Sequence, residues 1–452
     1  MMSMLTDVPF WTFFISVFAG YLLGVVSGLV PGIHTNNFAL ILLALSPVLS
    51  DYGFPLVCIA AMILSNAISH TFHDIIPSIF LGAPSSDMAL AVLPGHALLL
   101  EGRGAEAIRL SALGSAGSVA LALFIAVPMS LLFKIAYPFI QSHISWILLF
   151  IVFIMIMTER GEHIPGQGSL AHWKGRFYAL VIFLLCGFLG MFAFSMEHLM
   201  KPFISIGEPS ILLPLLSGLF GSSQLIISLM SISAIPAQLT SRMELDSKRI
   251  LRGIIVGGTS GSLVAWIPGI SSSVATVFAR LFIKEDFDKV SSKYNGYYYE
   301  DDTVLDSAKE FIVSVSGVNT CNAIFALLAL AVIGRTRSGA MVAIDGLLGD
   351  VWFDPSVIVL FMCAMSLTAI LSYHSTVFLG DSIHHRLSRI DYPLLCYTVL
   401  GLLFIMCLLF TGTFGLLIFV IATPMGMIAS FLKIRKSHAM GVIMMPVILY
   451  FL

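Results

Sequence analysis

Two Pro-Gly dipeptides interrupt apolar runs of the sequence, and each is followed by a short patch of polar residues. An offset of 237 residues superposes Pro31 and Gly32 on Pro268 and Gly269. Proline removes a backbone donor and clashes with a continuing helix, and glycine permits a turn. Each step therefore predicts a break in a helix, with a new helix starting just after it. The N–H groups and the positive dipole end of such a helix form a site that suits an anion.

The polar side chains beside the two breaks extend this prediction to a substrate-binding site. The predicted substrate-binding residues are Pro31, Gly32, His34, Thr35, Asn36, Asn37, Pro268, Gly269, Ser271, Ser272 and Ser273. Neither patch carries Lys or Arg, and a helix end supplies only about 0.5 of a charge. This favours a substrate less charged than a tricarboxylate, or a cation bound beside it. A plain loop or kink at the membrane surface is the alternative interpretation.

Further polar residues lie inside apolar runs, where ionisable groups are costly and usually face a cavity or a pathway. His70, His73 and Asp74 would share one helix face. The predicted residues for a coupling ion or a proton relay are His73, Asp74, Asp87, Asn319 and Asn322. A satisfied structural network is the alternative. No sequence motif indicates a metal site, a catalytic arrangement or a cofactor. We expect Arg335 and Arg337 to extend to a membrane surface.

The elements that must position these residues are apolar helices. Of the 452 residues, 58% are hydrophobic and 11% are charged, whereas soluble domains have about 25% charged residues. The composition predicts an all-α polytopic membrane protein. Residues 37–50 and 271–283 form apolar runs shorter than the ~20 residues of a full span. We therefore predict re-entrant hairpins at the two Pro-Gly steps, within two inverted structural repeats.

The predicted organisation has two membrane repeats with a connecting region between them. Residues 1–158 form the first repeat, 159–176 a polar linker, 177–248 the connecting membrane helices, and 249–452 the second repeat. A polar loop is predicted over residues 284–310 of the second repeat. Three clusters of basic residues predict the cytoplasmic face by the positive-inside rule. They are Arg242, Lys248, Arg249 and Arg252, then Arg386 and Arg389, then Lys433, Arg435 and Lys436.

Three stretches together resemble the large membrane subunit of tripartite tricarboxylate transporters, the TctA-type family. They read GLVPGIHTNNFALILLALSP, PSIFLGAPSSDMALAVLPGHALLLEGRGAEAI and AWIPGISSSVATVFAR. The chain is identified as a divergent member of archaeal type, in which Ser85 follows Pro84 where the family usually has glycine. The resemblance implies an inverted-repeat secondary carrier. It also implies two partners, a small membrane subunit and an extracytoplasmic binding protein.

These features favour a secondary active transporter, or permease, of a small organic anion. We expect a carboxylate as the substrate, Na⁺ or H⁺ as the coupling ion, and a multi-pass location in the cell membrane. The alternative is a carrier or flippase of a phosphorylated lipid such as polyprenyl-phosphate, because a phosphate suits a helix N-terminus equally well. A membrane enzyme or a structural subunit is a third class. The sequence shows neither a nucleotide-binding motif nor the basic stripe of a nucleic-acid-binding protein.

Overall fold

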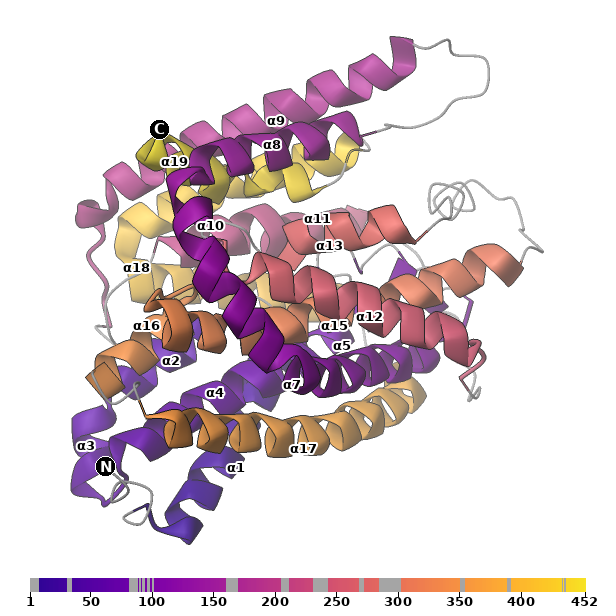
Figure 1. The fold of residues 1–452 in the computed structure, drawn as a ribbon. Helices are drawn as coiled ribbons and strands as arrows, with labels where there is room; N and C mark the ends of the chain where they lie inside the picture. The colour runs from indigo at the N-terminus through magenta and orange to yellow at the C-terminus, as the bar shows by residue number, and fades with distance from the viewer. Residues whose placement is uncertain are drawn as a thin grey trace.

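The fold is a bundle of helices (Figure 1). The computed structural model describes residues 8–30, 35–80, 101–159, 170–204, 211–230, 243–267, 272–283, 302–349, 354–387, 392–432, 434 and 436–452, and six positions between 88 and 99. No strand occurs among these residues. Seven helical segments of the described chain are long and apolar enough to cross a membrane: Phe10–Leu29, Leu56–Phe80, Gly104–Ser142, Trp173–Ser195, Leu305–Ile333, Pro355–Ile383 and Cys396–Phe431. The predicted fold class, an all-α polytopic membrane protein, is confirmed.

The first part of the chain contains the helices α1 (Phe10–Leu29), α2 (Thr35–Ala44), α3 (Ser46–Asp51), α4 (Leu56–His73), α5 (Ile75–Phe80) and α7 (Gly104–Ser142). Next come α8 (Ile144–Met157), α9 (Leu170–Ser195), α10 (Leu212–Leu216) and α11 (Ser223–Met230). The last part contains α12 (Ser247–Val264), α13 (Ser272–Phe282), α15 (Asp302–Ile333), α16 (Gly339–Leu348), α17 (Pro355–Leu387), α18 (Tyr392–Phe431) and α19 (Gly441–Phe451). We call α1 to α7 the first-half helices and α12 to α17 the second-half helices.

The two Pro-Gly steps are each followed by a short helix, as the sequence predicts. The helix α2 begins at Thr35 and α13 begins at Ser272, which are positions that the 237-residue offset superposes. The residues of the steps themselves, 31–34 and 268–271, lie outside the described residues. That a new helix starts just after each step is confirmed. That the chain turns back within the membrane there, and that the halves are inverted repeats, stay predictions.

Glycines bring one pair of helices together in each half. A Cβ atom at Gly20 of α1 would overlap the carbonyl oxygen of Met62 on α4, and one at Gly257 of α12 would overlap that of Ser314 on α15. Without side chains at these positions, the helix backbones can approach closely. The contact repeats one turn later, where Gly24 faces the Asn66 carbonyl and Gly261 faces the Val318 carbonyl. Both contacts match at an offset of 252 residues between α4 and α15.

Two large apolar cores lie side by side in the bundle. The first joins α1, α4, α7, α15, α16 and α17. The second joins α8, α9, α18 and α19, with contributions from α10 and α13. In Figure 1 the helices α1, α4 and α17 lie low in the view, and α8, α9 and α19 lie at the top. The 39-residue helix α7 runs from the lower group up to α8. The last helices of the chain therefore pack against the connecting helices, away from the first core.

Helices extend into two segments that the sequence predicts to be polar. The polar linker was predicted over residues 159–176, but α9 begins at Leu170. The polar loop was predicted over residues 284–310, but α15 begins at Asp302. Within α15, Lys309 and Glu310 are 1% and 0% exposed, because both make ion pairs with neighbouring helices. A pattern of charged residues thus indicated a solvated loop where these two side chains are paired inside the protein.

Candidate functional site

A cavity of about 100 Å³ lies between first-half and second-half helices. Its walls come from the start of α2, the last turns of α4, the residues just before the second Pro-Gly step, the middle of α15 and the start of α16. Small alanines make up part of the wall. Its polar lining residues are Thr35, His70, Thr71, Asn319, Asn322, Arg337 and Ser338. The structure therefore presents a small polar chamber within an apolar core.

Several predicted site residues meet at this cavity. Thr35, which follows the first Pro-Gly step, and Ile267, which precedes the second, line the same space. The amide nitrogen of Asn322 donates a hydrogen bond to Ser272 Oγ over 3.0 Å, and Ser272 is fully buried. Asn319 lines the cavity beside Asn322. The described residues that flank the two steps thus line one shared space, which is the arrangement that a common binding site requires.

Other predicted residues lie outside what the structure describes. These are Pro31, Gly32, His34, Asp87, Pro268, Gly269 and Ser271, and also the side chains of Asn37 and Ser273.

Asn36 contacts the second-half helix α16. Its Oδ1 accepts a hydrogen bond from the Ala340 backbone N–H over 3.1 Å. The Ser338 hydroxyl accepts a second one from the Met341 N–H over 3.3 Å. Both oxygens satisfy N–H groups that have no partner within the first turn of a helix. Asn36, predicted as a substrate ligand, therefore fixes the start of α16 against α2 at the cavity wall.

The ionisable residues at the end of α4, and Asp74 directly after it, point in different directions. His73 donates from Nδ1 to the Ser69 carbonyl over 2.7 Å, and its Nε2 lies 2.8 Å from Ser375 Oγ on α17. Asp74 accepts a hydrogen bond from Asn319 Nδ2 over 3.0 Å, and His70 Nε2 lies 3.9 Å from the same carboxylate oxygen. His70 lines the cavity. The polar contacts of His73 thus join α4 to α17, whereas those of Asp74 reach the cavity wall.

Sequence reasoning missed Arg337 as a cavity residue. We expected both arginines of the Gly-Arg-Thr-Arg-Ser segment to extend to a membrane surface, and Arg335 is exposed. Arg337, however, lines the cavity, with its guanidinium 5.6 Å from the Tyr137 ring centre. Its Nε is buried and has no hydrogen-bond partner among the described residues. The available signal was its place directly before Ser338, whose hydroxyl caps a helix that begins inside the core.

The charge on Arg337 persists at neutral pH. Burial lowers the pKa of its guanidinium and outweighs the opposing contact with Tyr137. An arginine nevertheless stays protonated within proteins. The cavity therefore carries a cationic donor, which neither polar patch beside the Pro-Gly steps supplies.

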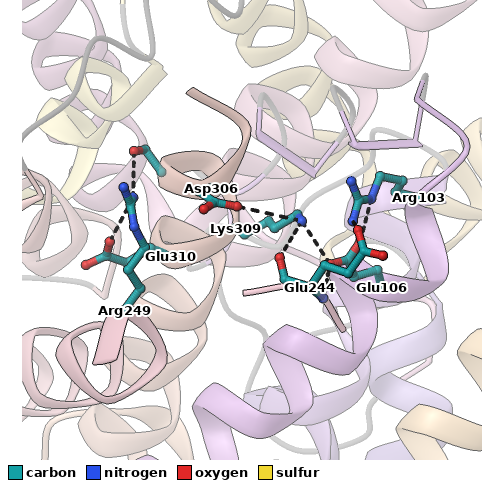
Figure 2. Close-up of polar contacts among 8 residues, drawn as sticks. Arg103, Glu106, Glu244, Arg249, Asp306, Lys309 and Glu310 are labelled. Atoms are coloured by element: carbon teal, nitrogen blue, oxygen red, sulfur yellow. Dashed lines mark hydrogen bonds and ion pairs between the residues drawn. The ribbon is translucent and has the colours of Figure 1, made fainter. Parts of the chain in front are cut away.

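A second polar cluster lies at the starts of α7 and α15 (Figure 2). Glu106, fully buried, accepts from Arg103 over 2.6 Å and lies 3.0 Å from Lys309 Nζ. Glu244 completes this group through an ion pair with Arg103 and backbone contacts with Glu106 and Lys309. Burial alone would lower the pKa of Arg103, but the contacts with both glutamates outweigh it and raise that pKa. The cluster therefore joins the first half to the second.

The same region holds a second buried glutamate. Glu310 on α15 receives a two-pronged contact from Arg252 on α12, with Nη2 2.6 Å from Oε2. Arg249 lies 3.6 Å from this carboxylate. Arg249 and Arg252 belong to one of the basic clusters that predict the cytoplasmic face. The side of the membrane on which they lie stays a prediction, and the sequence pattern did not indicate their buried partner.

Comparison with known proteins agrees with this architecture. The family model of the tripartite tricarboxylate transporter TctA family matches residues 14–441. An uncharacterized protein of Methanocaldococcus jannaschii is 25% identical over 441 residues, which cover 96% of this chain and 97% of the relative. No solved structure matches the chain. With its seven long apolar helices, the chain is a multi-pass membrane protein that belongs to the TctA family of tripartite tricarboxylate transporters.

Proposed function

We propose that the chain is the permease of a secondary carrier, which moves a small organic carboxylate across the cell membrane with Na⁺ or H⁺ as the coupling ion. One observation carries this proposal: the cavity between the two halves is lined by Arg337 together with neutral hydrogen-bonding side chains. Family membership makes the chain a transporter component. The cavity chemistry supports a carboxylate as the substrate.

The chemistry of a carboxylate matches this lining. A guanidinium can hold a carboxylate through two parallel N–H donors, and such charge-assisted bonds are stronger than neutral ones. The buried Nε of Arg337 is a donor that an anion would satisfy. Asn322 and Thr35 add neutral hydrogen-bonding groups nearby. The cavity is smaller than the ~300–1,000 Å³ of typical ligand pockets, so it favours a small, polar substrate.

The transporter would work with partners that the family implies. The family description refers to a tripartite transporter. We propose that an extracytoplasmic binding protein delivers the anion and that a small membrane subunit packs against this chain. The residues around Thr35 and Ile267 would then hold the anion between the two halves, which can move relative to each other. Binding between repeats and rocking of the repeats is the usual arrangement in secondary carriers.

The test of this proposal uses two arginines that are two residues apart. The purified full chain in lipid nanodiscs is titrated with radiolabelled citrate, succinate and fumarate, and uptake is measured in proteoliposomes with Na⁺ or H⁺ gradients, with and without the partner subunits. We expect Arg337→Gln to weaken carboxylate binding at least tenfold, in line with the about 1.5–3 kcal/mol of a charged hydrogen bond. Arg337→Lys should keep part of the affinity.

Arg335→Gln is the matched control, because Arg335 is exposed and does not line the cavity. Equal loss in both variants would contradict a direct role of Arg337. If no carboxylate binds and the chain instead retains a polyprenyl-phosphate in native mass spectra, the lipid-carrier alternative is favoured.

A further inference from the structure

The two halves supply different chemistry at matched positions of the cavity wall. The glycine contacts that pack α1 on α4 also pack α12 on α15, with an offset of 252 residues between α4 and α15. This offset superposes His70 on Asn322 and Asp74 on Ala326. His70, Asn322 and Ala326 all line the cavity. The first half therefore contributes ionisable groups at positions where the second half contributes an amide and a methyl group.

The carboxylate of Asp74 is connected to the cavity through Asn319. Asp74 is only 2% exposed and belongs to a membrane-spanning segment. Its Oδ2 accepts from Nδ2 of Asn319, a cavity residue of the opposite half, over 3.0 Å. His70 Nε2 lies 3.9 Å from the same oxygen, and His70 Nδ1 lies 3.0 Å from Ser27 Oγ. One amide thus faces both the buried acid and the space that the anion would occupy.

We propose that Asp74, assisted by His70, is the proton-binding site of the carrier, and that Asn319 couples its protonation to binding of the anion. The inference rests on the proposed function and assigns its coupling ion. While Asp74 is ionised, its negative charge holds the N–H of Asn319. When a proton binds to the carboxylate, this charge-assisted bond becomes a neutral one of roughly half the strength. Asn319 can then donate to a carboxylate held by Arg337.

The coupling works in both directions. Proton binding raises the affinity for the anion, and bound anion raises the affinity of Asp74 for the proton, because linkage between two sites is reciprocal. Protonation also removes a negative charge from the neighbourhood of an incoming anion. Release of the proton on the opposite side of the membrane returns Asn319 to Asp74 and weakens the hold on the anion.

The neighbours of the Asp74 carboxylate favour a proton over a metal ion. A hard cation such as Na⁺ requires a shell of oxygen ligands. The contacts of Asp74 Oδ2 that reach across the halves and along α4 are to nitrogen atoms, those of Asn319 and His70. In this arrangement the amide of Asn319 turns a donor toward the carboxylate. A buried acid beside an imidazole can instead take up or release a proton without rearranging an ion cage.

Other charged and titratable groups lie on α4 and on the elements packed around it. On α4 itself, His73 contacts Ser375 of α17, and Tyr21 of α1 lies against its ring. On the other elements packed around α4, the groups are Asp345 of α16, which is exposed, Asp381 of α17, which pairs with Arg109 of α7, and Arg337 across the cavity.

The experiment compares Asp74→Asn, Asn319→Ala and the control Asp345→Asn in the full chain, in nanodiscs and in proteoliposomes. The probe is radiolabelled fumarate between about pH 6 and pH 8.5, where carboxyl groups with ordinary pKa values stay ionised. In the wild type and in Asp345→Asn, we expect the affinity to fall by up to about tenfold per pH unit as Asp74 loses its proton. In Asp74→Asn the affinity should be independent of pH, with exchange retained and proton-driven accumulation lost.

Infrared difference spectra supply a readout that does not depend on transport. We expect a protonated-carboxyl band in the wild type at the lower pH, its loss in Asp74→Asn, and its persistence in Asn319→Ala. In Asn319→Ala the affinity should follow pH less steeply than in the wild type, because only the loss of the negative charge on Asp74 still favours the anion. The wild-type spectra remain informative even if a variant fails to fold. Fumarate affinity that is independent of pH in the wild type, or that follows pH equally in Asp74→Asn, would overturn the inference while leaving the proposed function intact. Absence of carboxylate binding at every pH would overturn both.

Discussion

The absence of a side chain at Gly20 allows α1 and α4 to pack closely. A methyl group there would overlap the Met62 carbonyl oxygen, so α1 and α4 would have to separate. We expect Gly20→Ala to destabilise the protein by about 1–3 kcal/mol, the range for overpacking, measured as a lower unfolding temperature in detergent. Gly401 on α18 is the control, because nothing lies within 4 Å of a Cβ there. Gly401→Ala should leave stability unchanged or raise it, and an equal loss in both variants would contradict the packing argument.

The contact between Asn36 and α16 can be tested by substitution of Asn36. Loss of a helix cap costs about 0.5–2 kcal/mol, so Asn36→Ala should lower the unfolding temperature. Asn36→Asp keeps an oxygen for the Ala340 N–H and should restore most of the stability. If Asn36 instead donated to the anion, the aspartate would repel that anion. Full loss of carboxylate binding in Asn36→Asp, with normal stability, would therefore favour the substrate role that the sequence predicts.

At the residue scale, the sequence predicted neutral side chains of the cavity and missed its cation. Thr35, Asn319 and Asn322 stood out because polar residues are rare in apolar runs, and all three line the cavity. Arg337 follows an apolar run, where a long side chain can reach either the surface or the core. Hydropathy gives the depth of a backbone position but not the direction of a flexible side chain, so this choice could not be made from the sequence.

At the scale of elements, the ion pairs between α7 and α15 hold the two halves together. Removing one partner of a buried pair costs about 3–5 kcal/mol, because the other charge stays buried. We expect Lys309→Met to destabilise the protein strongly, and the double variant Glu106→Gln with Lys309→Met to recover part of the loss. Lys248→Met, at an exposed lysine of α12, is the control. The unfolding temperatures of these variants and of the wild type, measured by size-exclusion chromatography with fluorescence detection, check this order of stability. Equal stability of Lys309→Met and wild type would contradict the pairing.

The starts of the short helices α2 and α13 could be predicted because proline and glycine act locally. The start of α15 could not, because its charged first turns are stabilised by Arg252 and Glu106 of other helices. A one-dimensional pattern cannot distinguish a charge that faces water from one that faces a distant partner. The first residues of α9 also lie in the segment interpreted as a linker, and there Lys174 and Arg176 contact aromatic rings of their own helix.

For the whole molecule, the cavity position predicts which sites a bound substrate should protect. Among the described residues only Cys363 is an exposed cysteine, so a Cys363→Ser background is suited to labelling. Ser338→Cys, at the cavity wall, should react with a small thiol reagent more slowly when carboxylate is bound. Ser142→Cys, at the exposed end of α7, should react at the same rate in both conditions. Unchanged labelling of Ser338→Cys at saturating carboxylate would contradict binding in this cavity.

The repeated Pro-Gly steps predict two related halves, whereas nothing in the sequence predicts the grouping of helices into two cores. The pairs α1 with α4 and α12 with α15 depend on glycine spacing within each half, which the sequence displays. The packing of α19 against α9 depends on Gly190, where a Cβ would overlap the Val442 carbonyl across some 250 residues. No periodic pattern predicts which distant apolar helix will meet such a glycine.

The buried contact between Glu106 and Lys309 has a consequence for biogenesis. Ribosomes add about 5–20 residues per second, so Glu106 enters the bilayer roughly 10–40 seconds before a partner some 200 residues downstream is made. Until then, the nearby Arg103 offsets part of the charge. The newly inserted first half should therefore be a target for membrane quality control. A fragment of residues 1–158 expressed alone should turn over quickly, and co-expression of residues 159–452 should protect it.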